Sequence, residues 1–437
     1  MKRVQKFIPY IIMLGSFFIR LYYVSVISVY KNQHDGGMPG GFGHLGYISY
    51  FVDNTSFPDF DVSQVDQFWH PPLHYFLTGK FLAFIWSIFP GQNGNYEMAQ
   101  ILPFVYVTAS IIFIYKSLTV VFKENWQQNL ALLFVAFQPS LIIRSATINN
   151  DALSTLLSVA FIYYLIRFVY SESVSYIILL MILFALGMWT KKNALLLVAP
   201  VGIVLLDMLI KDKKKTIFGS AIAFLAISPI SFGWYIFLKT RWGIPFNFVW
   251  NLSSPDAAAG YIENVSVIKR LLDFSISHFK FQYVFVGNNV EAIDINPITV
   301  LIKSSVNELW TWTYYNDGIK KLSFILLLAR IFITAILVLS VLLFSFDKRQ
   351  NFRVRALIVS FLLFNILSFY IFAFQNPYIC SMDYRYIEAV IICETVLFGY
   401  LAGRNKFYKY ALTLFTCGYV LTSALKIIVY GMQMFEQ

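Results

Sequence analysis

Long apolar segments separated by short polar ones run through the whole sequence. Twelve of them qualify as candidate membrane segments: 7–30, 73–89, 98–121, 127–143, 149–168, 176–190, 193–210, 217–238, 322–346, 354–374, 386–402 and 408–430. A helix needs about 20 apolar residues to cross the hydrocarbon layer of a bilayer. The pattern therefore predicts an all-α polytopic membrane protein, with residues 1–437 forming a single membrane-embedded domain.

The charged residues between these segments predict the orientation of the chain. Lys and Arg gather in the short stretches 1–6, 211–215, 347–355 and 403–409, which is typical of cytoplasmic loops. If all twelve segments crossed, the cluster 211–215 would lie outside. One segment is therefore expected not to cross, and 73–89 is the best candidate, because it follows Pro71-Pro72 and contains Lys80. The prediction is about 11 transmembrane helices plus one re-entrant or interfacial helix.

This arrangement places a second set of segments outside the cytoplasm. It comprises residues 31–97, 143–150, 190–193, 239–320 and 376–385. The two long external loops, 31–72 and 239–320, are expected to form the active-site face. The chain is accordingly predicted to be an integral, multi-pass protein of the plasma membrane, with its active site facing outside.

Composition excludes several classes of protein. Hydrophobic residues make up 58% of the chain and charged residues 13%, against roughly a quarter charged in soluble proteins. The net charge of +11 lies mainly in the cytoplasmic stretches, so it indicates no nucleic-acid partner. Three cysteines supply no disulfide framework, and no Gly-rich phosphate loop is present, which argues against a nucleotide-driven pump.

The first external loop carries the most informative chemistry. Asp35 directly follows the first apolar segment and precedes Gly36-Gly37, which lets a substrate approach the backbone. A carboxylate at this boundary suits a general base, although a solvated loop aspartate is the ordinary alternative. Four histidines fall between residues 34 and 74: His34, His44, His70 and His74. They lack close metal-ligand spacing, so no cofactor is required and a divalent metal is only possible.

A second polar group stands where another apolar segment begins. Asn149, Asn150 and Asp151 resemble an N-cap cluster, since Asx side chains satisfy the open N–H groups of a helix start. Capping alone explains one of the three. The cluster is on the same predicted side as Asp35, so binding a sugar or supporting the base is an equal alternative.

Cations on the external side oppose the usual charge distribution. Lys191 and Lys192 interrupt an apolar stretch, and Arg385, beside Tyr386, opens the eleventh segment. Cations in such positions stabilise a bound phosphate at the level of the lipid headgroups. The alternative is that these side chains extend from helix ends to the lipid headgroups.

In this order the motifs resemble the C-type superfamily of membrane glycosyltransferases. The similarity is greatest to glycosyltransferase family 39, which includes the protein O-mannosyltransferases. It rests on the acid after the first segment, on His70-Pro71-Pro72-Leu73, and on the later Asn-Asp, Thr-Lys and Arg-Tyr pairs. Many members have Asp-Glu where this chain has Asp35-Gly36, so any role of the second acid has no equivalent here.

The resemblance implies an inverting transferase that moves a sugar from a polyprenyl-phosphate donor to an extracytoplasmic acceptor, which is a protein, a lipid or an envelope polymer. It implies that Asp35 is the catalytic base and that Lys191, Lys192 and Arg385 bind the donor phosphate. His34, His44, His70, Asn150, Asp151 and Tyr386 are assigned to substrate binding or to support of the site. A transporter or flippase of lipid-linked sugars is the alternative, but it would concentrate polar residues near the bilayer midplane.

Overall fold

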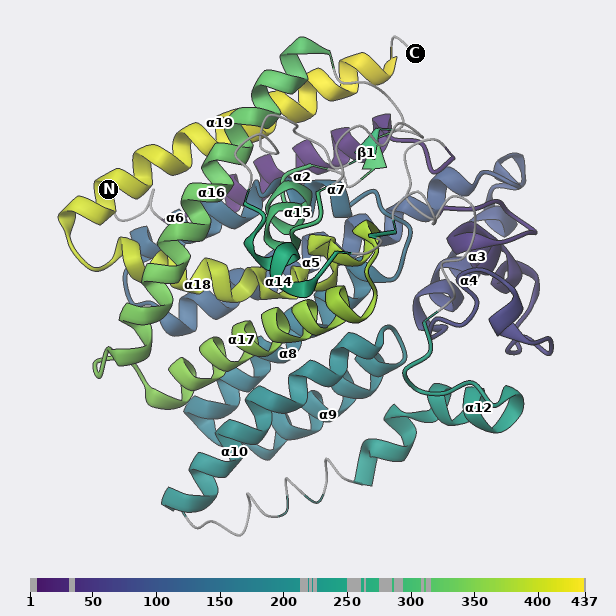
Figure 1. Ribbon diagram of the computed structural model, residues 1–437, viewed down its shortest axis with the longest axis horizontal. Helices are drawn as coiled ribbons and strands as arrows, with labels where there is room; N and C mark the ends of the chain where they lie inside the picture. Colours follow the sequence, from purple (N-terminus) through teal and green to yellow (C-terminus); the bar gives the residue numbers. More distant parts are fainter. Residues whose placement is uncertain are drawn as a thin grey trace. The chain divides into compact units, whose positions relative to one another are not determined.

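The described part of the computed structural model consists mainly of helices (Figure 1). The structure describes residues 6–30, 36–212, 219, 222, 226–249, 261–262, 265–274, 285–286, 294–307, 310–311 and 316–435. Seven described helical stretches are long and apolar enough to cross a membrane, and two shorter apolar helices accompany them. The chain is therefore an all-α, integral, multi-pass membrane protein, as predicted. The number of 11 crossings stays a prediction. The expectation that 73–89 does not cross also stays a prediction.

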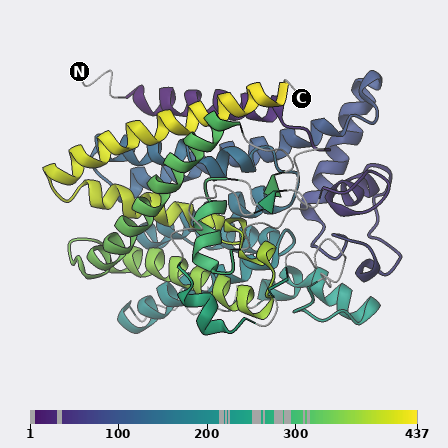
Figure 2. The same ribbon diagram turned by 45° about the horizontal axis from the view of Figure 1, so that its top comes forward.

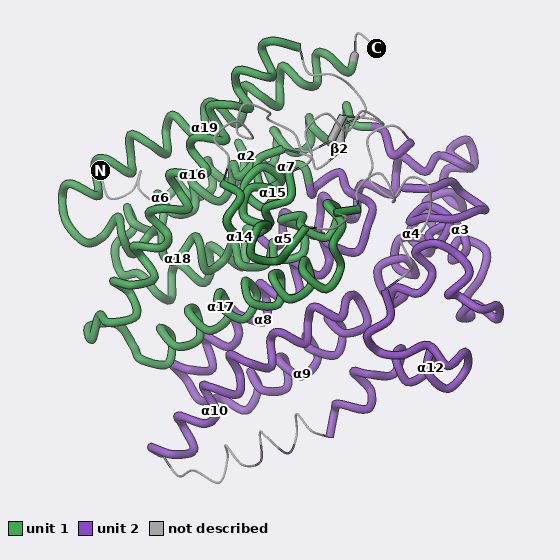
Figure 3. Tube along the Cα trace, viewed as in Figure 1, with its two compact units in different colours: residues 1–27, 111–143, 252–437 green, residues 28–110, 144–251 purple. Residues whose placement is uncertain are grey.

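The seven long stretches coincide with predicted segments. They are Ile8–Val26, Tyr96–Val121, Asp151–Ser171, Lys192–Lys211, Asp317–Phe346, Phe352–Gln375 and Lys406–Met434, and the shorter helices are Leu73–Ile88 and Val174–Met188. Contacts along the chain divide it into two compact units, each assembled from segments distant in sequence (Figure 3). The single domain over 1–437 stays a prediction.

Unit 1 comprises residues 1–27, 111–143 and 252–437. Its helices are α2 (Ile8–Val26), α6 (Asn125–Ala136), α14 (Val267–Leu272), α15 (Pro297–Ser304), α16 (Asp317–Phe346), α17 (Phe352–Gln375), α18 (Ile391–Ala402) and α19 (Lys406–Phe435), with the end of α5 (Ile101–Val121) and most of α7 (Pro139–Arg144). Helix α19 lies along α2 and α16, so the first and last described helices of the chain are neighbours (Figure 2). The unit also contains a short parallel pair, β1 (Phe285–Val286) and β2 (Trp310–Thr311), and the short helical turns Ile379–Met382, Tyr384–Tyr386 and Glu388–Val390.

Unit 2 comprises residues 28–110 and 144–251. Its helices are α3 (Gly43–Asp53), α4 (Leu73–Ile88), α8 (Asp151–Ser171), α9 (Val174–Met188), α10 (Val198–Asp212) and α12 (Gly233–Trp242), with the start of α5. Helix α8 packs along α9, and α3 packs along α4. Three places in this unit form the candidate site: the start of α4, the start of α8 and the end of α9.

Helix α3 lies inside the stretch 31–72 that the sequence analysis treats as a loop. Most of its residues are buried, so it shows no polar face from which its period could be recognised. Two glycines allow the backbone conformation that leads into α3. Gly37 and Gly43 have φ of +68° and +76°, and a Cβ at Gly37 would lie 1.9 Å from the Phe42 carbonyl oxygen. The backbone after residue 35 is therefore a tight turn, closed by the Leu45 N–H donating to the Gly36 carbonyl at 2.7 Å.

Charged side chains inside unit 1 find partners within the protein. Arg20 is 1% exposed and donates to the Ala136 carbonyl at 3.3 Å, so its guanidinium is held inside the unit. Arg330 of α16 forms two hydrogen bonds of 2.7 Å to the carboxylate of Glu394 in α18. Because both side chains are only 6% exposed, each charge is hydrated poorly and depends on the other.

The Arg330–Glu394 pair yields a prediction for stability. Arg330→Met leaves the Glu394 carboxylate buried without its partner, which typically costs about 3–5 kcal/mol. We expect a large fall in the melting temperature of the detergent-solubilised protein. The double variant Arg330→Met with Glu394→Met buries neither charge, and we expect it to recover most of the loss.

The exposed pair Lys320–Asp317 supplies the control. Its side chains are 42% and 89% exposed, so Lys320→Met should cost less than about 1 kcal/mol. A double variant that melts as low as Arg330→Met would show that the loss comes from packing rather than from an unpaired charge.

Candidate functional site

Three sequence motifs come together in unit 2. They are the start of α4 after His70-Pro71-Pro72, the turn 144–151 before α8, and the turn 188–191 after α9. Pro72 precedes the helix, so the N–H of Leu73 is one of the open donors of its first turn. That N–H donates to the Trp189 carbonyl at 3.0 Å. The start of α4 is thereby attached to the end of α9.

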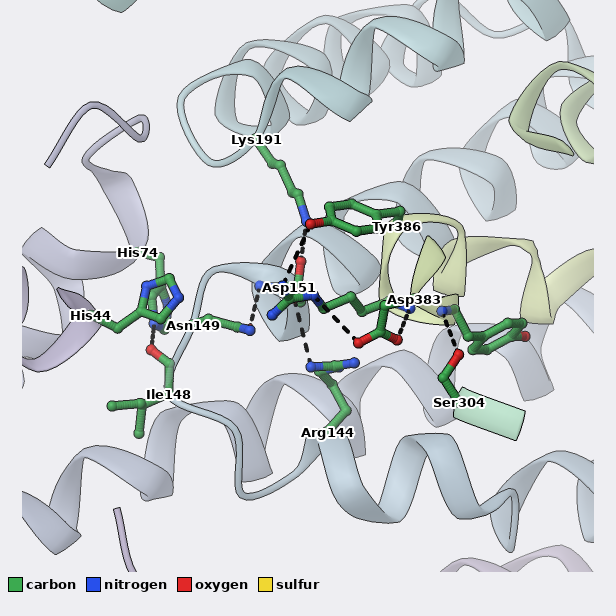
Figure 4. A network of polar contacts seen from close by, with 12 residues as sticks. His44, His74, Arg144, Ile148, Asn149, Asp151, Lys191, Ser304, Asp383 and Tyr386 are labelled. Carbon is green, nitrogen blue, oxygen red and sulfur yellow. Dashed lines mark hydrogen bonds and ion pairs between the residues drawn. The ribbon is translucent and has the colours of Figure 1, made fainter. Parts of the chain in front are cut away.

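His74 attaches α4 to the turn before α8. Its Nε2 lies 2.7 Å from the Ile148 carbonyl oxygen and therefore carries the hydrogen. The side chain is fully buried, and its Nδ1 has no hydrogen-bond partner. Asp151 follows Ile148 by three residues, so the hydrogen bond between His74 and Ile148 helps to fix the polar cluster in place (Figure 4).

The two asparagines of the cluster have separate tasks. Asn149 Oδ1 accepts the N–H of Asp151 at 3.0 Å, which satisfies one open donor of α8. Asn150 occupies the N-cap position without capping, and its Nδ2 donates instead to the Thr190 carbonyl at 2.8 Å. Capping thus accounts for one residue, and Asn150 joins the turn before α8 to the turn after α9.

Asp151 lies between two cations. Lys191 Nζ forms a hydrogen-bonded ion pair with Asp151 Oδ1, and Arg144 Nη1 lies 3.6 Å from Asp151 Oδ2 (Figure 4). The three side chains are 10% exposed or less. Two positive charges and one negative charge make this trio positive by one. Sequence reasoning missed Arg144, although a cation on the predicted external side was the signal that singled out Lys191.

Lys192 has contacts other than those of this trio. Its Nζ donates to the Phe248 carbonyl at 3.1 Å and lies 5.7 Å from the centre of the Trp69 ring. The ring of Trp69 stacks on His70 at 4.0 Å, and His70 stacks on His44 at 6.1 Å. His44 Nδ1 in turn lies 2.9 Å from the Tyr75 hydroxyl. The stacked rings of Trp69, His70 and His44 form one aromatic column in unit 2, and Lys192 lies against its Trp69 end.

Arg385 and Tyr386 belong to unit 1, in the short helical turn Tyr384–Tyr386. Asp383 starts this turn, and its Oδ1 accepts the N–H of Arg385 at 3.0 Å. The guanidinium of Arg385 lies 3.5 Å from Asp383 Oδ2 and 5.3 Å from the centre of the Tyr386 ring. The Arg385 guanidinium thus contacts both the carboxylate and the ring.

Two predicted residues, His34 and Asp35, lie outside the described residues. Within the described part of the chain, no group of three or more His, Cys, Asp and Glu side chains could hold a metal ion. The divalent metal named from the histidines stays a hypothesis.

The aromatic column that contains His70 also yields a prediction for the pH dependence of stability. Burial, with His44 and the two lysines nearby, lowers the pKa of His70 well below its ordinary value of about 6.5. The unfolded chain then binds a proton below about pH 6.5 that the folded protein does not, so stability is lost as the pH falls. We expect the melting temperature to fall between about pH 7 and pH 5, and His70→Gln to flatten that slope. Identical pH profiles for parent and variant would contradict this account.

Comparison with known proteins relates the site to a family. Residues 69–234 match the model of the dolichyl-phosphate-mannose-protein mannosyltransferase family, and this range contains Arg144, Asp151 and Lys191. Comparison with curated protein sequences gives no significant match.

Solved structures resemble the chain over nearly its whole length. The archaeal oligosaccharyltransferase AglB from Archaeoglobus fulgidus, in complex with an inhibitory peptide and a dolichol-phosphate, superimposes with a TM-score of 0.55 at 11% identity, covering 98% of this chain and 56% of AglB. ArnT from Cupriavidus metallidurans gives a TM-score of 0.51 at 10% identity, covering 97% and 77%. An oligosaccharyltransferase structure in complex with Zn and sulfate is similar, with a TM-score of 0.51 at 12% identity, covering 95% and 53%.

These similarities confirm the resemblance that the motifs predicted. The chain spans 56% of the length of AglB and a larger share of ArnT, and at such identities the likeness establishes the fold. The chain therefore shares the fold of these solved structures, and its residues 69–234 match the model of the dolichyl-phosphate-mannose-protein mannosyltransferase family.

Proposed function

We propose that this protein is a glycosyltransferase that moves a sugar from a polyprenyl-phosphate donor to an acceptor outside the cytoplasm, with inversion at the anomeric carbon. The observation that carries the proposal is the buried trio of Arg144, Asp151 and Lys191. It lies within the range that matches the mannosyltransferase family. Two cations held around one carboxylate leave a positive charge suited to a phosphate.

The donor phosphate is the group that this charge fits best. AglB was solved with a dolichol-phosphate, a lipid phosphate of the class proposed here. Asp151 orients the ammonium of Lys191, which can then stabilise both the bound donor and the charge that develops on the departing phosphate. The sequence resemblance assigns the same task to Lys192 and Arg385.

Asp35 is proposed as the catalytic base. It accepts the proton of an acceptor hydroxyl while that oxygen attacks the anomeric carbon from the face opposite the phosphate. The bond from the anomeric carbon to the phosphate oxygen breaks, and polyprenyl phosphate leaves with the electron pair. No nucleotide is needed, because the lipid-linked donor already carries the activation. The tight turn after Gly36 gives the chain following Asp35 a defined course.

Binding and turnover should separate in two variants. Asp35→Asn keeps the shape of the side chain but cannot accept a proton, so we expect donor binding to persist and turnover to fall by about a hundredfold to ten-thousandfold. Lys191→Ala removes a charged hydrogen-bond donor, so we expect polyprenyl-phosphate binding to weaken by about tenfold to a hundredfold. The measurements are release of polyprenyl phosphate from a polyprenyl-phosphate sugar, and titration with polyprenyl phosphate itself.

Two matched variants serve as controls. Asp59→Asn changes another aspartate of the same loop and should turn over like the parent. Lys348→Ala removes a lysine between α16 and α17, in a stretch predicted to be cytoplasmic, and should bind polyprenyl phosphate like the parent. An Asp35→Asn protein that keeps more than about a tenth of parental turnover would remove Asp35 as the base. Equal loss of binding in Lys191→Ala and Lys348→Ala would indicate general destabilisation.

A further inference from the structure

Unit 1 contains a second set of buried contacts around the turn that carries Arg385. The residue before it, Tyr384, is 1% exposed, whereas the Arg385 side chain is 9% exposed. These consecutive residues have separate partners: Tyr384 is fixed by the unit interior, and Arg385 by Asp383 and Tyr386. Because Tyr384 and Arg385 are consecutive in the short turn Tyr384–Tyr386, the contacts that fix the backbone of Tyr384 also fix the point from which the Arg385 side chain starts.

Two contacts fix Tyr384. Its backbone N–H donates to Ser304 Oγ at 2.9 Å (Figure 4). Its ring lies 5.1 Å from the guanidinium of Arg330, the residue held by Glu394. A cation over the face of an aromatic ring is worth more when water is excluded, as it is around this buried pair. One contact holds the backbone of the turn, and the other holds the ring.

Ser304 is well placed to hold this backbone. It stands at the end of α15, and its hydroxyl donates to the Val300 carbonyl at 2.8 Å, which leaves the oxygen lone pairs for the Tyr384 N–H. The preceding residue, Lys303, is fully buried and pairs with Asp294 at 2.5 Å. Beyond the helix, Lys426 of α19 donates to the Val306 carbonyl at 2.7 Å. Helix α15 is thus fastened on both sides of Ser304.

We propose that Ser304, acting with the ring contact between Tyr384 and Arg330, is a positioning residue that presents Arg385 to the phosphate of the lipid donor. This inference rests on the proposed function. It assigns a task to part of the 239–320 stretch, namely holding the donor-binding turn rather than touching the substrate. Ser304 and Tyr384 act through Arg385 and make no contact with the phosphate.

The test measures the affinity of the purified full chain for polyprenyl phosphate in detergent. Ser304→Ala leaves the Tyr384 N–H without its acceptor, and we expect about fivefold weaker binding, since one net hydrogen bond is worth about 1 kcal/mol. Ser304→Thr keeps the hydroxyl and should bind like the parent. Tyr384→Leu removes the ring and should weaken binding by about tenfold, whereas Tyr384→Phe keeps the ring and should not.

The neighbouring Ser305 provides a matched control. It is also fully buried, and its hydroxyl donates to the Ile302 carbonyl rather than meeting the turn. Ser305→Ala should leave affinity unchanged. Equal weakening by Ser304→Ala and Ser305→Ala, or parental affinity in both Ser304→Ala and Tyr384→Leu, would overturn the inference.

A double-variant cycle separates positioning from general damage. If Ser304 acts through Arg385, Ser304→Ala should weaken binding in the parent and add nothing once Arg385→Ala is present. Additive losses would overturn the inference, because they would show that Ser304 acts independently of Arg385. A parent that binds no polyprenyl phosphate at all would instead contradict the proposed function.

Discussion

A charge buried in a membrane protein must be matched within the protein, because neither lipid tails nor packed helices hydrate it. This constraint organises unit 2 around Asp151. The carboxylate is paired by Lys191 and Arg144. Asn150 joins the two turns that carry these cations, and His74 attaches the start of α4 to the turn before α8. The same pairing that makes the burial tolerable also leaves an excess positive charge. Structure and proposed chemistry therefore depend on one group of side chains.

Unit 1 obeys the same constraint with different partners. Glu394 matches Arg330, and Asp294 matches Lys303. The side chain of Lys426 is satisfied by a carbonyl and by the amide oxygen of Asn307. These contacts join α15, α16, α18 and α19 around the turn that carries Arg385. The described polar groups of unit 1 thus pair with one another around a turn, whereas a transporter is expected to place polar residues along a pathway near the bilayer midplane.

The sequence predicted the helices well because crossing a bilayer imposes an apolar length, and that length is visible without any contacts. Lys191 and Asp151 could be recognised in the sequence because one interrupts an apolar stretch and the other stands in a polar cluster that helix capping alone does not explain. The sequence analysis missed helix α3 because most of its residues are buried, so no polar face distinguishes it in the sequence. Ser304 and Arg330 were beyond prediction, since their importance comes from partners 80 and 64 positions away, Tyr384 and Glu394. Such pairings follow from tertiary packing alone.

The central claim is that a sugar leaves its lipid carrier on this protein. The most direct measurement places the purified protein in sealed vesicles with a panel of polyprenyl-phosphate sugars and an extract of envelope acceptors, and quantifies free polyprenyl phosphate and intact donor in each leaflet. The account predicts that at least one donor releases polyprenyl phosphate in proportion to sugar transferred. Movement of intact donor between leaflets, with no release from any donor, would contradict it and would indicate a transporter of lipid-linked sugars.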